Sequence, residues 1–200
     1  CGVRVGKAVK ALPETTVASS FQLYQELGLR GEVNFPAFEQ ALKGFSRYAS
    51  GQDRLLVLID YTKPSTEKRF YILDLLQKKL LLSTYVAHGR GSGDNYAVAF
   101  SNRPGSYQSS LGFFRTGDTY MGKNGYSLFL DGLEKGINDK ARERAIVVHG
   151  ANYADPAVLK GQQRLGRSLG CPALPPDISK QVIDTIKGGV LLYIYGLNKA

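Results

Sequence analysis

Short apolar runs, each ended by a polar or glycine-containing cluster, follow one another from Leu55 to the end of the chain. Runs of this length, rich in β-branched and aromatic residues and bounded by turn formers, are typical of β-strands. No apolar run approaches the roughly 20 residues that a membrane-spanning helix requires. The sequence therefore predicts a mainly β domain, whose strands we expect in RLLVLID, RFYILDL, KLLLSTYVAHG, YAVAF, SLFLDGL, RAIVVHG and VLLYIYG.

Helical spacing of apolar residues occurs on either side of these runs. Residues 21–29 and 36–49 predict two short helices, the second with Pro36 in its first turn. Residues 175–189 predict a C-terminal helix that closes with glycine. With 200 residues the chain suits one sizeable domain, so we divide it into a helical leader, 1–50, and a β-rich domain, 51–200.

The charge of the chain is strongly positive. Its 26 Lys and Arg residues exceed its 17 Asp and Glu residues, for a net charge of +9. Such a charge attracts polyanions, among them nucleic acid, anionic lipid and an acidic cell wall. The basic residues are spread from Arg4 to Lys199 without a run or a nucleic-acid-binding signature. We therefore expect no nucleic-acid partner.

The chain begins with Cys1 and Gly2 rather than methionine. A mature lipoprotein whose signal peptide has been removed begins in this way, and so does a cloning boundary. We expect an exported protein of the cell envelope or periplasm, associated with a membrane only if Cys1 carries lipid.

Cys171 lies between a glycine and a proline in GRSLGCPALP, and the chain has only one other cysteine and two histidines, His88 and His149. A free thiol is only slightly ionised at neutral pH, so a nucleophilic cysteine needs a base or a positive environment. His149 ends an apolar run and is followed by Gly150, which suits a base held at a strand end. A tight turn at Gly170 would leave the backbone N–H groups of Gly170 and Cys171 as donors to an oxyanion.

These residues also allow structural or ligand-binding interpretations without catalysis. A lone cysteine is commonly a small buried hydrophobe, and a histidine at a strand end is commonly a satisfied core residue. A zinc site from His88, His149, Cys171 and Asp155 would lack the close paired spacing of metal ligands, so we expect no metal. The glycine-dense loop 88–95 lacks the phosphate-binding pattern, and we expect no cofactor.

HGANY followed by GRSLGCPALP resembles the active-site signature of the murein L,D-transpeptidase catalytic domains of YkuD type. The resemblance extends through STYVAHGRGSG, FSNRPGSYQSSLGFFRTGDTY and GYSLFLDGLEKGINDKARERAIVVHG, and so over about residues 51–200. It is closest to the subfamily in which Cys-Pro-Ala replaces the commoner Cys-(Ile/Val)-Arg. The fold that it implies is a small β-sandwich or flattened barrel.

The resemblance also implies roles and a reaction. Cys171 is implied as the nucleophile, His149 as the general base, and Ser168, Leu169 and Gly170 as the segment that orients the imidazole and helps form the oxyanion hole. The thiolate attacks the third-residue carbonyl of a peptidoglycan stem tetrapeptide and releases D-alanine, leaving a thioester. Transfer to an amine makes a 3-3 cross-link, whereas transfer to water is L,D-carboxypeptidase activity. A non-catalytic cell-wall-binding β module is the competing hypothesis.

Substrate binding is where the chain departs from the commoner motif. The commoner motif has a histidine at the position of Leu169 and an arginine near the position of Ala173. We predict that Arg167 takes over from this arginine, with Arg103 and Arg115 as further candidates. His88 is predicted to line the cleft and contact substrate, or else only to shape its loop. Among the other substrate-binding residues we place Gly150, Asn152 and Tyr153.

Overall fold

The computed structural model describes residues 17–50 and 53–199. Cys1, which the sequence leaves as either a lipidation site or a cloning boundary, lies outside the described residues. One eight-stranded sheet forms the body of the molecule, in the order β3-β2-β1-β8-β4-β5-β6-β7. Its strands are β1 (Leu55–Asp60), β2 (Phe70–Asp74), β3 (Lys79–Thr84), β4 (Gly112–Gly122), β5 (Gly125–Gly132), β6 (Val147–Gly150), β7 (Ala173–Leu174) and β8 (Leu191–Tyr195).

The two ends of this sheet meet. Strand β7 lies at one edge and β3 at the other, yet Ala87, just after β3, pairs with Ala173 of β7. The sheet therefore nearly closes on itself, which confirms the predicted flattened barrel. Strands β6 and β7 run parallel, with His149 opposite Ala173, and this pairing positions the candidate site.

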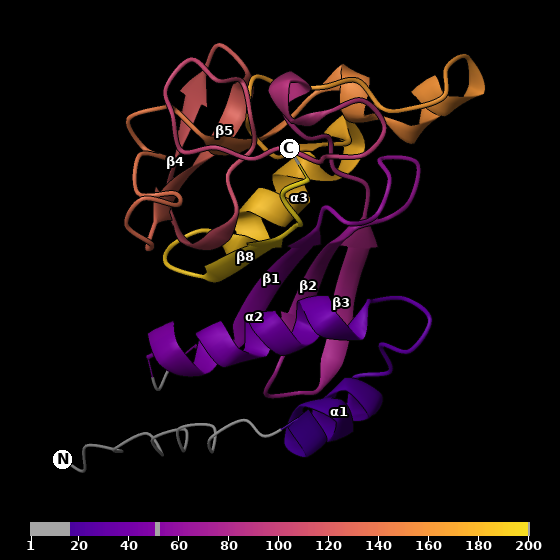
Figure 1. Ribbon diagram of the computed structural model, residues 1–200, viewed down its shortest axis with the longest axis vertical. Helices are drawn as coiled ribbons and strands as arrows, with labels where there is room; N and C mark the ends of the chain where they lie inside the picture. Colours follow the sequence, from indigo (N-terminus) through magenta and orange to yellow (C-terminus); the bar gives the residue numbers. More distant parts are fainter. Residues whose placement is uncertain (1–16, 51–52, 200) are drawn as a thin grey trace, which may run out of the picture.

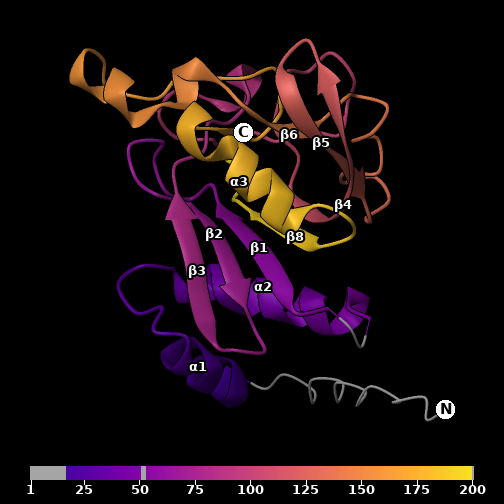
Figure 2. The same ribbon diagram turned by 180° about the vertical axis from the view of Figure 1, so that it is seen from behind.

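Three helices accompany the sheet, close to where the sequence predicts them: α1 (Val17–Glu26), α2 (Phe35–Tyr48) and α3 (Pro176–Ile186). Figure 1 shows α2 lying across β1, β2 and β3, and Figure 2, from behind, brings α3 to the front. Within the described ranges, no helix is long and apolar enough to cross a membrane.

The alternation of β1 explains why its run is apolar throughout. Leu56 and Leu58 belong to a buried cluster with α1 and α2, whereas Val57 and Ile59 belong to the main core, which α3 completes. Since successive side chains of a strand point to opposite faces, β1 is buried on both. The helices before residue 50 thus share a core with the sheet, and the division of the chain after residue 50 stays a prediction.

Two parts of the β pattern differ from the prediction. Residues 96–100 form no strand, because the N–H groups of Val98 and Ala99 both donate to Ser92 O, at 2.8 and 3.1 Å. Conversely, the sequence does not predict β4, because GFFRTGDTYMG has glycines at both ends and at its centre. The register between β4 and β5 shifts between Thr116 and Thr119, so β4 continues through an irregularity that reads as a turn in the sequence.

Candidate active site

Cys171 lies two positions before β7 and faces the start of β6. Its Sγ accepts the N–H of Val147 at 3.4 Å, and the thiol donates to Ala145 O at 3.4 Å. His149 follows two positions beyond Val147 on β6. Residues two apart on a strand share a face and lie roughly 6–7 Å apart. The β6–β7 pairing thus brings the predicted nucleophile and the predicted base into one neighbourhood.

The imidazole of His149 has a defined tautomer. Its Nδ1 lies 2.9 Å from Gly150 O, and because a carbonyl only accepts, Nδ1 carries the proton. The neutral ring therefore offers Nε2 as its acceptor. Burial lowers the pKa of His149, whose side chain is only 3% exposed, so the ring is neutral at pH 7. A neutral imidazole with a free acceptor nitrogen is the state that a general base requires.

Ser168 ties the cysteine turn together. Its Oγ donates to Cys171 O at 2.6 Å and accepts the Gly170 N–H at 3.1 Å. The Gly170 N–H is thus occupied, which corrects the expectation that it faces an oxyanion. The Cys171 N–H, by contrast, has no hydrogen-bond partner among residues 17–50 and 53–199, and it is the remaining candidate donor. Ser168 orients the turn, whereas the imidazole is held by Gly150.

Gly170 and Leu169 differ in how tightly they are held. Gly170 has a φ of +127°, and a Cβ there would lie 3.0 Å from Gln108 O. Only glycine adopts this conformation without strain. Leu169 is 58% exposed, so its side chain stands in solvent beside the buried turn.

The resting thiol of Cys171 is protonated. Burial raises its pKa, and the Val147 N–H and the positive charge of Arg144 lower it by less. The side chain is 8% exposed. Cys171 therefore meets His149 as a neutral pair, and proton removal has to accompany the chemical step.

Arg144 is a further candidate functional residue, which the sequence around Cys171 does not indicate. Its Nη2 lies 3.5 Å from the position that a Cβ on Gly170 would take. The signal was a cation at the start of RAIVVHG, the run that ends in the predicted base. This signal is weak because Arg144 and Cys171 are far apart in sequence, and only the pairing of β6 with β7 brings them together.

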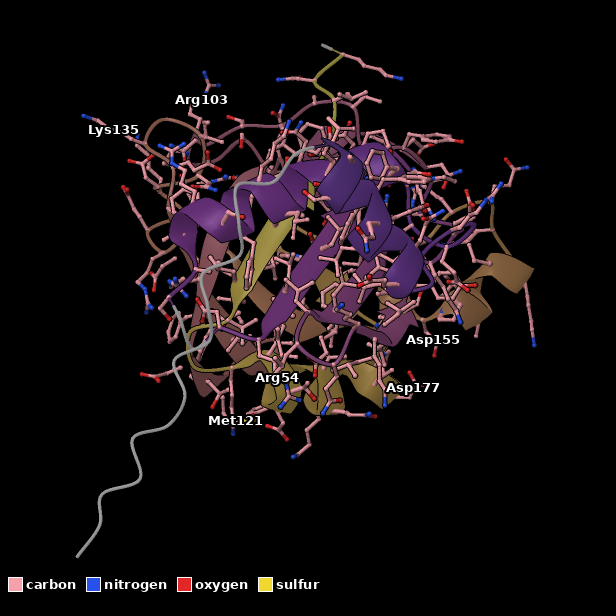
Figure 3. All side chains as sticks on the ribbon, turned by 90° about the horizontal axis from the view of Figure 1, so that it is seen from below. Arg54, Arg103, Met121, Lys135, Asp155 and Asp177 are labelled. Carbon is pink, nitrogen blue, oxygen red and sulfur yellow. The ribbon has the colours of Figure 1, made fainter. Side chains whose placement is uncertain are left out.

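The three arginines that were predicted to bind substrate have other contacts. Arg167 donates to Gly93 O at 3.2 Å and lies 4.0 Å from Asp94, so it is directed to the glycine-dense loop. Arg115 donates to Tyr48 O and Gly189 O, beside α2. Arg103 projects from the periphery of the molecule near Lys135 (Figure 3). Substrate binding by Arg167 stays a prediction.

His88 does not fit the predicted contact with substrate. Its side chain is 0% exposed, Nδ1 accepts from Arg69 at 2.8 Å, and Nε2 donates to Asp94 O at 2.9 Å. Burial, with the charge of Arg69, lowers the pKa of His88 to about 3. With both nitrogens in use inside the core, His88 shapes the loop, which was the alternative role.

The three residues after His149 that were predicted to bind substrate lie in different surroundings. Tyr153 packs against Gly166, and burial, with a smaller effect of a Cys171 charge, raises the pKa of Tyr153 to about 12. Gly150 faces α3, since a Cβ on it would lie 2.4 Å from Ser179 Oγ. Asn152 is exposed. Their predicted contacts with substrate stay predictions.

The zinc alternative gains no support from the geometry. In the part of the chain that the structure describes, no three His, Cys, Asp or Glu side chains are grouped to hold a metal ion. Asp155 instead accepts the Ala157 N–H at 2.9 Å and caps a short 3₁₀ helix, Pro156–Lys160.

Comparison with known proteins gives the following similarities. No curated protein matches the sequence. Among solved structures, an L,D-transpeptidase from Mycobacterium smegmatis is similar with a TM-score of 0.43 at 13% identity, over 72% of this chain and 59% of that one. The helical cell shape determining protein Pgp2 from Campylobacter jejuni is similar with a TM-score of 0.47 at 15% identity, over 74% of this chain and 50% of that one. This chain thus spans less than two thirds of these proteins.

The family profile gives the assignment. The profile of the L,D-transpeptidase catalytic domain matches residues 29–195, which include α2, every strand of the sheet, and the segment from Val147 to Cys171. The match begins inside the predicted leader, in line with the core that α2 shares with β1. The chain belongs to the L,D-transpeptidase catalytic domain family.

Proposed function

We propose that this protein is a peptidoglycan L,D-transpeptidase in which Cys171 is the nucleophile and His149 the general base. One observation carries the proposal. The Cys171 thiol contacts β6 at Val147, two positions before His149, whose ring is neutral and offers Nε2 as its acceptor. Membership of the family supplies the class of substrate, peptidoglycan stem peptides.

The first half-reaction forms a thioester. His149 Nε2 takes the proton of the Cys171 thiol as Sγ attacks the third-residue carbonyl of a stem tetrapeptide. The Cys171 N–H donates to the oxyanion that develops on that carbonyl. As the intermediate collapses, the imidazolium returns the proton to the leaving nitrogen, and D-alanine departs.

The second half-reaction regenerates the thiol. The side-chain amine of a diaminopimelate on a neighbouring stem attacks the thioester, and His149 accepts a proton from that nitrogen. The C–S bond breaks, an amide forms, and the proton moves to Sγ. If water replaces the amine, the product is a free tripeptide and the activity is that of an L,D-carboxypeptidase.

The environments of the two residues support this order of proton transfers. Burial raises the pKa of Cys171 and lowers that of His149, so both groups rest in their neutral forms. A neutral thiol needs a base at the moment of attack, and His149 supplies it. The net charge of +9 favours contact with an anionic cell wall, which supports a location in the cell envelope.

Incubation with disaccharide tetrapeptides, followed by mass analysis of the products, tests the proposal. Cross-linked dimers show transpeptidation, and free tripeptides show carboxypeptidation. Cys171→Ala should abolish either product, whereas Cys1→Ser, which removes the other cysteine, should leave them unchanged. Tetrapeptides that remain intact with the wild-type protein would overturn the enzymatic proposal and favour a wall-binding module.

A further inference from the structure

Within the ranges that the structure describes, no carboxylate pairs with the positive charge of Arg144. Throughout the described residues, no ion pair includes it, although Arg142, two positions earlier, pairs with Asp131 at 2.6 Å. Arg144 is only partly exposed. Charges that are removed from water are usually paired, because desolvation is costly. A partly buried guanidinium without a carboxylate therefore points to an anion that forms elsewhere in the site.

Neutral acceptors fix this guanidinium in place. Nη1 donates to Ser101 O and Ser110 Oγ, and Nη2 donates to Ser106 Oγ and Gln108 O, at 2.7 to 3.1 Å. Four of the five N–H donors of the side chain are thus used by one segment of the chain, residues 101–110. Too few donors remain for bidentate binding of a substrate carboxylate. The contacts hold the charge without neutralising it.

The guanidinium of Arg144 lies beside the turn that carries Cys171. Arg144 Nη2 lies 3.5 Å from the place of a Cβ on Gly170, the residue before Cys171. The next residue, Ala145, has a φ of +55° and directs its carbonyl to the thiol. Burial lowers the pKa of Arg144, and a negative charge on Cys171 acts against this and raises it.

We propose that Arg144 is a positioning residue that supplies the counter-charge for the negative charge that develops at Cys171 as its proton is removed during attack, and then for the negative charge of the tetrahedral intermediate. Its guanidinium is preorganised by residues 101–110, so little reorganisation is needed when that charge appears. The inference rests on the proposed role of Cys171 as the nucleophile.

Alkylation of Cys171 by two reagents of different charge tests the inference without any murein substrate. In a Cys1→Ser background only Cys171 reacts, and iodoacetate is an anion whereas iodoacetamide is neutral. A fixed cation beside the thiol speeds iodoacetate relative to iodoacetamide, and this ratio does not depend on the fraction of thiolate. Arg144→Gln removes the charge, Arg144→Lys keeps it, and Arg142→Gln is the matched control on the same segment.

The expected results are specific. Arg144→Gln should lower the iodoacetate-to-iodoacetamide ratio by about threefold or more and should slow iodoacetamide at pH 8 by a similar factor, because half a pKa unit is about threefold in thiolate. Arg142→Gln should stay within about twofold of the parent ratio. Arg144→Lys keeps the charge but not the four hydrogen bonds of the guanidinium, so its ratio should lie between those of the parent and Arg144→Gln. Equal ratios for Arg144→Gln and Arg142→Gln, or an Arg144→Lys ratio as low as that of Arg144→Gln, would overturn the inference.

Folding of the variants is followed by circular dichroism and thermal unfolding. If Arg144→Gln does not fold, the parent protein is compared with a short neutral peptide that contains one cysteine. The iodoacetate-to-iodoacetamide ratio of the parent should exceed that of the peptide by about threefold or more. A ratio equal to that of the peptide overturns the inference. Failure of the muropeptide assay would instead overturn the proposed function and leave the charge measured at Cys171 unaffected.

Discussion

The hydroxyl of Ser168 donates to the carbonyl oxygen of Cys171 at 2.6 Å while it accepts the N–H of Gly170 at 3.1 Å. One buried side chain thus closes the turn that presents the thiol. Removal of this hydroxyl leaves a buried N–H and a carbonyl without their partner. We therefore expect both a lower free energy of unfolding and a displaced Cys171 turn.

Ser168→Ala should therefore lose activity more than stability. We expect the free energy of unfolding to fall by about 1–3 kcal/mol and turnover of tetrapeptide to fall by about tenfold or more, because a misplaced nucleophile is costly. Urea unfolding and product analysis measure the two effects. Ser46→Ala, which removes a single contact to Leu42 O within α2, is the control and should leave turnover unchanged. Full turnover in Ser168→Ala would show that the turn does not need the hydroxyl.

Gly170→Ala should disrupt the same turn from the backbone side. At φ +127° an alanine is strained, and its Cβ would lie 2.9 Å from Ile146 Cδ1. We expect a loss of about 1–3 kcal/mol in unfolding free energy, together with lost activity. Gly161→Ala is the matched control, since a Cβ there meets nothing within 4 Å. Equal stability of the two variants would contradict the strained conformation of Gly170.

The stability of the protein should depend on pH through His88. Burial lowers the folded-state pKa of His88 to about 3 from 6.5. Below pH 6.5 the unfolded chain therefore binds a proton that the folded protein does not, and stability is lost as the pH falls toward 3. Between pH 7 and pH 5 this amounts to about 2 kcal/mol. Urea unfolding at both pH values measures it, and His88→Asn should have a shallower dependence. An equal dependence in both proteins would contradict the neutral, buried state of His88.

The activity should depend on pH through His149. Burial lowers the pKa of this imidazole below its ordinary 6.5, and a general base must be deprotonated. As the pH falls through the lowered pKa, kcat/KM should therefore decline, with the midpoint of the acid limb below 6.5. Rates on tetrapeptide from pH 4 to 8 locate the midpoint. An acid limb centred above 6.5 would mean that another group controls the activity.

The part of the fold that could be predicted is the part with unbroken local patterns. Strand β1 is apolar throughout because both of its faces are buried, and α2 and α3 have apolar residues at helical spacing. Strand β4 could not be predicted in this way, because its glycines and Asp118 are typical of turns, and only its partners β5 and β8 keep it extended. The reverse holds for residues 96–100, which form an apolar run typical of a strand but lie in a loop.

The candidate site likewise has residues that the sequence indicates and residues that only the fold brings together. The scarcity of cysteine and histidine indicated Cys171 and His149, and local spacing indicated the glycine turn. Arg144 and the carbonyl of Ala145 could not be found from the sequence around Cys171, because they come from the segment before β6. The burial of His88 likewise depends on Arg69, a contact between distant parts of the chain.

The thioester on Cys171 is the intermediate on which the proposed function depends. Intact-protein mass spectrometry after brief incubation with a disaccharide tetrapeptide and quenching in acid detects it directly. We predict a mass gain equal to the mass of the substrate minus that of the released D-alanine. The added group should be located on the peptide that contains Cys171 and should be absent from Cys171→Ala. A protein that converts the tetrapeptide without this adduct, or that carries the adduct on another residue, would contradict Cys171 as the nucleophile.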